Sequence, residues 1–130
     1  RQVNFTAKDL CPNRIVSVDR DKLYQVVLNL LLNAADAVGE GGRVALLAYE
    51  YEGDYCLQVA DDGPGVPHEQ REQIFELFFT TKPPGKGHGI GLTTCRSIIE
   101  RHGGRLEVMR SEWGGAAFVA RFQLNEAERI

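Results

Sequence analysis

The sequence is poor in the features that would assign a small protein to a class at once. Its 130 residues contain only three cysteines, Cys11, Cys56 and Cys95, and no C-x-x-C pair. An odd number of widely spaced cysteines argues against a disulfide framework and favours reduced thiols in or near the core. The three histidines show no ligand spacing with these cysteines, which argues against a zinc site.

The sequence also lacks an excess of positive charge and long apolar runs. The formal net charge is −3, whereas a nucleic-acid-binding protein needs a basic face, so we expect no nucleic-acid partner. No apolar run approaches the roughly 20 residues of a membrane span, and no signal peptide is recognisable. The chain opens on Arg1 rather than Met. We therefore expect a cytoplasmic fragment of a longer protein, without membrane contact of its own, and an anchor elsewhere in that protein stays open.

What is present is a globular balance of 43% hydrophobic and 25% charged residues, with helical and strand-like patterns alternating along the chain. Apolar spacing of i, i+3, i+4, i+7 predicts a helix from an N-cap at Asp19 to about Val38, and a second from Gly89 to about His102. A shorter helix is expected over 68–77. Strands are predicted over 2–5, 15–18, 43–51, 55–60, 106–110 and 116–124. This mixture predicts one α+β two-layer sandwich over residues 1–130, with 125–130 as a frayed tail.

Three polar residues form a line along the first predicted helix. Asn29, Asn33 and Asp36 stand at i, i+4 and i+7. Asn is a poor helix former, and both amides are embedded among leucines in Leu-Asn-Leu-Leu-Leu-Asn. A solvated helix edge is one interpretation, although such an edge more often carries Glu, Lys or Gln. The other is a site for hydrated Mg²⁺, which keeps several waters and takes few protein oxygens.

An acidic turn follows the predicted strand 55–60. It reads Asp61-Asp62-Gly63-Pro64-Gly65, and Asp-Gly and Pro-Gly are common turn formers in their own right. In a functional interpretation, Asp61 is shielded at the strand end and accepts a hydrogen bond from an exocyclic amine such as that of adenine. The glycines would then let the base lie against bare backbone.

A glycine-rich segment leads into the second long helix. Residues 85–91 read Gly-Lys-Gly-His-Gly-Ile-Gly, which fits neither the dinucleotide-binding fingerprint nor the Walker P-loop. Free N–H groups and the macrodipole at a helix N-terminus attract anions, and Lys82 and Lys86 would add positive charge. Taken alone, the segment is equally consistent with a flexible loop.

The order of these segments is more specific than any one of them. N-L-L-L-N-A, D-D-G-P-G, I-F-E-L-F-F-T-T-K and G-H-G-I-G-L closely resemble the N, G1, F and G2 boxes of the histidine kinase ATP-binding domain. That domain shares the Bergerat fold with gyrase B, Hsp90 and MutL, and the resemblance covers about residues 19–124. It implies a mixed sheet of about five strands with three helices on one face. ATP would lie between the helices and a lid formed by residues 79–88.

The resemblance also implies roles for individual residues. Asn33 would ligate Mg²⁺, and Asn29 would support the ion or a phosphate, so these two are the candidate catalytic residues. Asp61 would accept from the adenine 6-amino group, with Gly63 and Gly65 making room for the ring. Phe75 and Phe78 would anchor the lid, and Gly87, Gly89 and Gly91 would present backbone to the phosphates. The further ATP-binding positions that it implies are Asp36, Val66, Thr80, Thr81, Lys82, Lys86, His88, Ile90 and Leu92.

Three positions depart from the family pattern. Asp36 stands where many members have a basic residue, and the Asp-Ala-Val that it opens resembles the nitrogen-regulation and oxygen-sensor branch. His88 occupies a lid position that is often small or polar. Gly-Ala-Ala at 115–117 replaces a Gly-Thr-Thr-like box, so we expect a hydroxyl contact to be lost there.

The expected activity follows from the residue at position 29. Hydrolysing relatives carry Glu where Asn29 stands, and an amide cannot take a proton from water. Transfer of the ATP γ-phosphoryl to an acceptor therefore fits better than hydrolysis. His68 follows the acidic turn without a helical hairpin, and His102 reads as a helix C-terminal residue. We thus expect the acceptor histidine on a separate dimerisation domain, from which a response regulator would take the phosphoryl group.

Two other functions stay open on the same fold. One is an anti-sigma-type serine/threonine kinase, although its relatives usually carry Glu at the position of Asn29. The other is a module that binds ATP or ADP without catalysis.

Overall fold

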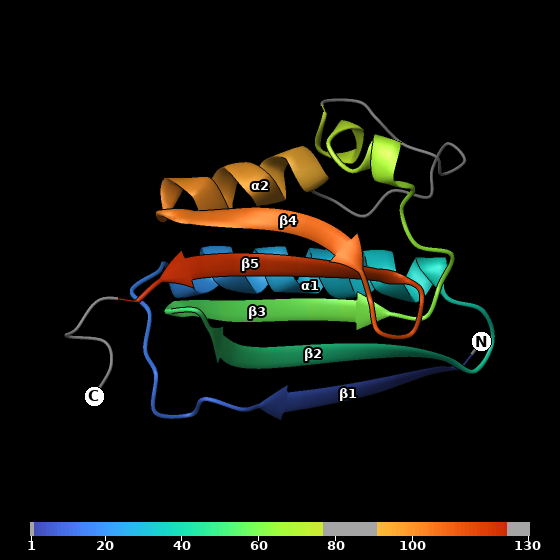
Figure 1. The fold of residues 1–130 in the computed structure, drawn as a ribbon, viewed down its shortest axis with the longest axis horizontal. Helices are drawn as coiled ribbons and strands as arrows, with labels where there is room; N and C mark the ends of the chain where they lie inside the picture. The colour runs from blue at the N-terminus through green and yellow to red at the C-terminus, as the bar shows by residue number, and fades with distance from the viewer. Residues whose placement is uncertain (1, 77–90, 125–130) are drawn as a thin grey trace.

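The computed structural model describes residues 2–76 and 91–124. Within that part of the chain, five strands form one mixed sheet in the order β1-β2-β3-β5-β4 (Figure 1). β1 runs parallel to β2, and the other neighbouring strands are antiparallel. The strands are β1 (Val3–Asp9), β2 (Gly42–Tyr51), β3 (Asp54–Asp61), β4 (Gly104–Arg110) and β5 (Ala116–Gln123).

Two α-helices, α1 (Arg20–Ala37) and α2 (Leu92–Arg101), lie against each other and against the sheet (Figure 1). α1 packs on β2 and β3, and α2 packs on β4. A third helical stretch contacts α2 and consists of two 3-10 turns, η1 (His68–Gln70) and η2 (Gln73–Phe75). The predicted α+β fold, a mixed five-stranded sheet with helices on one face, is therefore confirmed. Over the described ranges, no helix is long and apolar enough to cross a membrane.

α1 forms where its local signals agree. Oδ1 of Asp19, the predicted N-cap, accepts hydrogen bonds from the backbone N–H groups of Asp21 (2.9 Å) and Lys22 (3.1 Å), which satisfies donors that a helix start leaves free. The apolar face of the helix then enters the core through Val26, Leu30 and Ala34. The N-cap at Asp19 and the helix predicted from the apolar spacing are thus both confirmed.

The predicted strand at 15–18 is wrong. The segment has no regular secondary structure, although its side chains do alternate. Ile15 is 63% exposed, whereas Val16 and Val18 pack against the core. Alternating burial gives an extended segment the same sequence pattern as a strand, but no ladder forms without a partner backbone.

Other helices and strands differ from the prediction in where they begin or end. The strand predicted at 2–5 continues to Asp9 because its whole length pairs with β2. The helix predicted over 68–77 is replaced, up to residue 76, by the turns η1 and η2. The second long helix was predicted to start at Gly89, but α2 starts at Leu92. Residues 77, 89 and 90 lie outside the described part of the chain.

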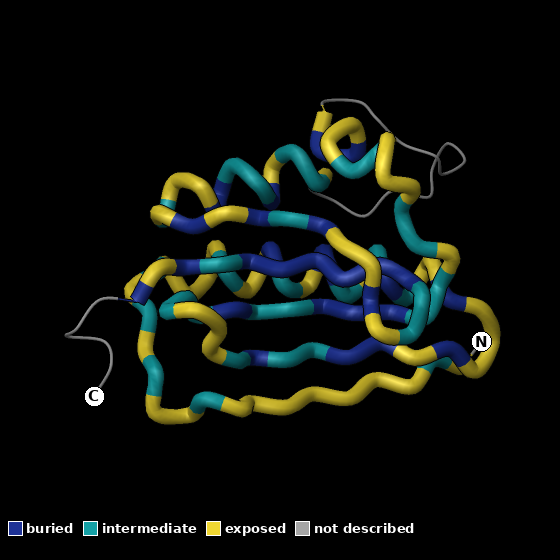
Figure 2. The backbone as a smooth tube through the Cα atoms, in the orientation of Figure 1, coloured by how far each residue is buried: buried dark blue, intermediate teal, exposed yellow. Residues whose placement is uncertain are grey.

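The end of β3, the start of β5 and the end of α1 meet at one end of the sheet. Figure 2 shows that β3 and β5, in the middle of the sheet, are largely buried, whereas the edge strand β1 is exposed. Ala60, near the end of β3, pairs with Ala117, near the start of β5. The last carbonyl of α1, at Ala37, approaches Gly63 just beyond β3. The acidic turn therefore lies where two strands and a helix converge.

Candidate nucleotide-binding site

Asp61 is the most unusual polar residue at this end of the sheet. It is the last residue of β3 and is only 2% exposed. Its Oδ1 accepts hydrogen bonds from the backbone N–H groups of Gly63 (2.9 Å) and Ala116 (3.2 Å). Within the part of the chain that the structure describes, no donor reaches Oδ2. One carboxylate oxygen is thus fixed, and the other is the candidate acceptor for a ligand.

The electrostatics of Asp61 follow from this environment. Burial raises the pKa of Asp61, because the charged form loses its hydration. The N–H groups of Gly63 and Ala116 oppose the rise, because they bind the ionised form. The neighbouring charge of Asp62 adds a smaller upward contribution. A buried carboxylate that is held on one side only is chemically suited to accept from an amine that arrives on its other side.

The adjacent carboxylate of Asp62 serves the fold instead. Its Oδ1 accepts from the backbone N–H of Arg43 (3.0 Å), and its Oδ2 accepts from Nε of the same residue (3.3 Å). The hydrogen bond from the Arg43 backbone is the main cause that holds the pKa of Asp62 below its usual range. Asp62 thus ties the end of β3 to the start of β2, and only Asp61 remains for a ligand.

The two glycines of the acidic turn stand where contacts within the fold disfavour a side chain, which the sequence alone did not reveal. A Cβ at Gly63 would stand 2.8 Å from the carbonyl oxygen of Ala37, at the end of α1. Gly65 has φ +78 and faces the carbonyl of Gly114, 3.3 Å from an added Cβ. Val66 packs partly against the core. Both glycines are therefore required by contacts within the chain, and their role in making room for a purine ring stays a prediction.

The polar line on α1 runs from the interior to the surface. Asn29 is 4% exposed, and its Nδ2 donates to Sγ of Cys95 on α2 (3.4 Å). Burial raises the pKa of the Cys95 thiol to about 11, so this cysteine is an inert hydrogen-bond partner. Asn33 is half-buried, and Asp36 is exposed. The amide group of Asn29 therefore joins the two helices, while Asn33 and Asp36 lie progressively nearer to solvent.

No ready-made metal cluster accompanies these amides. Among residues 2–76 and 91–124, no group of three His, Cys, Asp or Glu side chains is placed to hold a metal ion. The predicted Mg²⁺ ligand Asn33 would not appear in such a group, because its ligating atom is an amide oxygen. Its role as a ligand, like the catalytic roles of Asn29 and Asn33, stays a prediction.

Phe75 fixes η2 against α2 and the sheet. The ring is 5% exposed and meets Phe118 edge-on, with centroids 6.3 Å apart. The guanidinium of Arg96 lies 4.4 Å from the Phe75 ring centroid, and the hydroxyl of Thr93 donates to the Phe75 carbonyl. Arg96 also forms an ion pair with Glu72 (3.1 Å). These contacts hold Phe75 in place shortly before the lid predicted at 79–88, and its role as an anchor of that lid stays a prediction.

The other fixed point beside the predicted lid is the start of α2. Gly91 is the N-cap of α2, and its carbonyl accepts from the N–H of Cys95 (3.1 Å). The N-cap residue is a glycine and supplies no capping side chain, and the N–H groups of a helix start attract anions. Leu92, the first helical residue, packs partly on the core. The remaining predicted site residues lie outside the described part of the chain: Phe78, Thr80, Thr81, Lys82, Lys86, Gly87, His88, Gly89 and Ile90.

Ser111 and Gly115, in the turn between β4 and β5, were not among the predicted site residues. The Ser111 side chain is buried and bonds the backbone of Asp61. A Cβ at Gly115 would collide with the carbonyl oxygen and with Oδ1 of Asp61. The sequence signal was weak, because serine and glycine are ordinary turn residues. Their position against Asp61 is visible only once β3 and β5 are paired.

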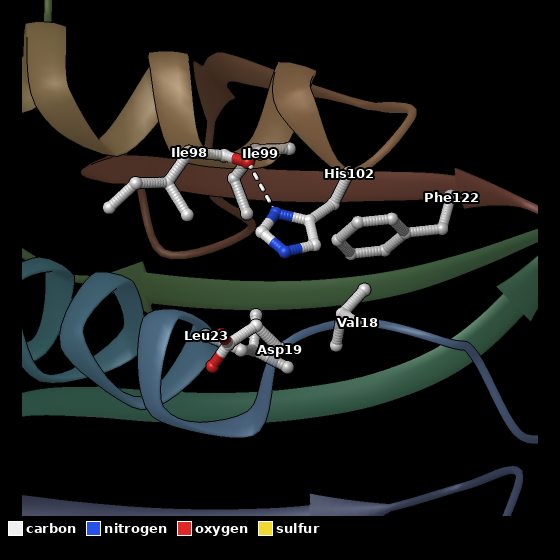
Figure 3. Close-up of a pocket in the computed structure, with 7 residues that line it drawn as sticks. All are labelled: Val18, Asp19, Leu23, Ile98, Ile99, His102 and Phe122. Atoms are coloured by element: carbon white, nitrogen blue, oxygen red, sulfur yellow. Dashed lines mark hydrogen bonds between the residues drawn. The ribbon is translucent and has the colours of Figure 1, made fainter.

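A separate hollow lies at the opposite end of the helices and holds no site. It is lined by residues from the start of α1, the end of α2 and β5, and it has no room for a water molecule. Figure 3 shows the His102 ring in it, with Nδ1 2.8 Å from the carbonyl oxygen of Ile98. His102 is the C-cap of α2, as predicted. The hollow is a packing seam between the two helices.

Comparison with known proteins identifies relatives of this chain. The sequence profile of the histidine kinase-, DNA gyrase B-, and HSP90-like ATPases matches residues 18–126. The sensor histidine kinase ZraS of Escherichia coli O157:H7 is 40% identical over 124 residues, which is 95% of this chain and 26% of that protein. The chain thus spans about a quarter of the length of this relative.

Solved structures show the same likeness. The catalytic domain of histidine kinase ThkA superposes with a TM-score of 0.80 at 34% identity, over 93% of this chain and 78% of that one. Histidine kinase ThkA in complex with the response regulator TrrA superposes with a TM-score of 0.78 at 30% identity. That alignment covers 98% of this chain and 36% of the kinase chain.

Proposed function

Because the chain belongs to the family of histidine kinase-, DNA gyrase B-, and HSP90-like ATPases, we propose that it is the ATP-binding catalytic domain of a sensor histidine kinase. It transfers the γ-phosphoryl group of ATP to a histidine on a dimerisation domain elsewhere in the same protein. A response regulator then receives the group from that histidine. The solved complex of ThkA with TrrA, a response regulator, supports this partner by likeness.

The observation that carries the proposal is the unpaired oxygen of Asp61. Oδ1 is held by the N–H groups of Gly63 and Ala116, while Oδ2 of this buried carboxylate has no donor among the described residues. The 6-amino group of adenine supplies such a donor. A 6-oxo purine would instead bring an acceptor against a carboxylate, which selects against guanine.

The phosphates and the metal ion belong on the other side of the site. Asn33 on α1 would hold Mg²⁺, and Asn29 would contribute only through its oxygen, because its nitrogen donates a hydrogen bond to Cys95. The start of α2 at Gly91, where the N-cap residue supplies no side chain, would attract the phosphates. When bound, Mg²⁺ would supply positive charge that neutralises the phosphates. The chain itself supplies positioning, and residue 29 supplies no base to activate water.

The proposal is tested by binding first and transfer second. Calorimetry with MgATP and MgADP is expected to show 1:1 binding, in the micromolar range or weaker. The chain is then incubated with Mg²⁺ and γ-labelled ATP, alone and with the histidine-bearing helical hairpin of its own protein. Label should pass only to the hairpin, as an acid-labile phosphohistidine.

Controls separate the parts of this proposal. Asn33→Ala should lower binding of MgATP but leave metal-free ATP binding largely intact, because only the ion-dependent contact is removed. No binding of either nucleotide at millimolar concentration would refute the proposal. An acid-stable product would point to serine or threonine phosphorylation, and rapid release of free phosphate would point to hydrolysis.

A further inference from the structure

The Ser111 hydroxyl is fully engaged although it lies in a turn. The residue is 6% exposed, immediately after β4. Its Oγ donates to the backbone carbonyl of Asp61 (2.7 Å) and accepts from the N–H groups of Trp113 (3.2 Å) and Gly115 (3.0 Å). A hydroxyl has one proton to donate and two lone pairs, so this side chain has no capacity left for a ligand.

These bonds close the β4–β5 turn onto the candidate site. The backbone N–H of Ser111 donates to the Gly115 carbonyl (2.8 Å), and the N–H of Gly114 donates back to the Ser111 carbonyl (3.0 Å). Gly115 then lies so close to Asp61 that no side chain fits between them. The next residue, Ala116, donates its N–H to Oδ1 of Asp61. The hydroxyl therefore holds the turn whose following N–H orients the carboxylate.

We propose that Ser111 is a positioning residue that orients the Asp61 carboxylate and so sets the preference of the site for purines that carry a 6-amino group. The inference rests on the proposed function. Ser111 acts through Asp61, by keeping the Ala116 N–H on Oδ1. Oδ2 is then the oxygen that faces the ligand.

Removal of the hydroxyl has a defined consequence. The Asp61 carbonyl and the N–H groups of Trp113 and Gly115 lose their partner in a buried place, which is costly unless the turn moves to water. When the turn moves, the Ala116 N–H leaves Oδ1 and the carboxylate is free to rotate. A ligand without a 6-amino group makes no hydrogen bond to Oδ2, so its affinity does not depend on that orientation.

The test compares two nucleotides on two proteins. Dissociation constants of ADP and of purine riboside 5′-diphosphate, which lacks the 6-amino group, are measured by calorimetry on the parent chain and on Ser111→Ala. We expect the parent to prefer ADP by about tenfold or more, as for a hydrogen bond to a charged group. In Ser111→Ala, ADP should bind roughly tenfold more weakly while the analogue stays within about twofold, so the preference collapses toward one.

Matched variants guard against a purely structural explanation. Ser97→Ala removes a hydroxyl that accepts only from Arg101 on the surface of α2, and it should keep the full preference. Ser111→Thr retains the hydroxyl and should restore the preference, whereas Ser111→Cys, with a weak donor, should fall between. If Ser111→Ala does not fold, this Thr and Cys pair decides the question.

The outcomes distinguish the inference from the function on which it rests. If the parent binds ADP and Ser111→Ala keeps its preference, or loses affinity for both nucleotides equally, the positioning role is refuted. The same holds if folded Ser111→Thr loses the preference. If the parent binds neither nucleotide, the proposed function itself fails.

Discussion

The two ends of the helix–sheet interface both contain a polar side chain in apolar surroundings, and they satisfy it differently. At one end, half-buried His102 is bonded within its own helix, to the carbonyl of Ile98. A carbonyl only accepts, so Nδ1 carries the proton there. At the other end, Asp61 is held by N–H groups of Gly63 and Ala116, and one of its oxygens is left over.

This difference separates a packing seam from a candidate site. The His102 end is satisfied by a residue four positions away, and its hollow is too small for water. The Asp61 end draws on a turn and a strand that are far apart in sequence, yet the burial of its carboxylate is compensated on one side only. Buried polar groups are normally paired, so Oδ2 of Asp61, which has no donor among the described residues, is a candidate acceptor for a ligand.

The largest effect on ADP affinity is expected from Asp61→Asn, which changes the residue that distinguishes the two ends. The amide oxygen must take the place of Oδ1, because that position accepts from two N–H groups. The amide NH₂ then faces the ligand and meets the adenine amine donor to donor. ADP affinity measured by calorimetry should fall by about 1.5–3 kcal/mol, roughly 10- to 150-fold, while the thermal transition stays cooperative.

Asp62→Asn is the matched control for that change. It alters the adjacent carboxylate, whose two oxygens accept hydrogen bonds from Arg43. Its ADP affinity should equal that of the parent. Equal losses in the two variants would mean that Asp61 acts only as a turn residue.

Asp19→Ala probes the opposite end, with a smaller effect of a different kind. It removes the oxygen that caps α1 through the N–H groups of Asp21 and Lys22. Urea denaturation should show a loss of about 1 kcal/mol in the free energy of unfolding, with no change in ADP affinity. Asp21→Ala, which removes only a first-turn charge, should cost less. A marked loss of ADP binding in Asp19→Ala would show that the two ends are coupled.

The elements that were predictable from sequence are those whose signals are local. The cap at Asp19 and the periodic burial of α1 both fall within one stretch of chain, and both were found. The segment 15–18 misled because alternating burial was read as a strand, whereas a strand also requires a pairing partner. The helix expected over 68–77 is, up to residue 76, a pair of short 3-10 turns, of which η2 buries Ile74 and Phe75 much as a helix would.

The candidate site was half-predictable for the same reason. Asp61 stands in a recognisable turn, so its importance could be inferred from neighbouring residues. Ser111 reaches it across 50 positions, and the partner of Asn29 is 66 positions away. Such pairs depend on strand register and helix packing, which one sequence does not state. The role of Asn29 beside the ion or a phosphate stays a prediction, and the hydrogen bond from its nitrogen to Cys95 is revealed only by the packing of the helices.

The last expected effect is a pH dependence specific to Asp61, which is confined to acidic pH. Burial raises the pKa of Asp61 above the ordinary value of 3.8, and an ionised Oδ2 is needed to accept from the adenine amine. As pH falls through this raised pKa, Oδ2 gains a proton and becomes a donor, so ADP affinity declines by at most about tenfold per pH unit. The stability of the ligand-free domain moves the opposite way. A carboxyl whose folded pKa is raised contributes stability at pH values below its unfolded pKa, and that contribution is lost as pH rises through the folded pKa.

Titrating both the parent and Asp61→Asn from neutral pH toward the ordinary aspartate range isolates the effect on ADP affinity, because protonation of the ADP phosphates affects both proteins alike. If ADP affinity falls equally in the two proteins, Asp61 does not titrate in this pH window. The loss of affinity then does not come from protonation of Oδ2.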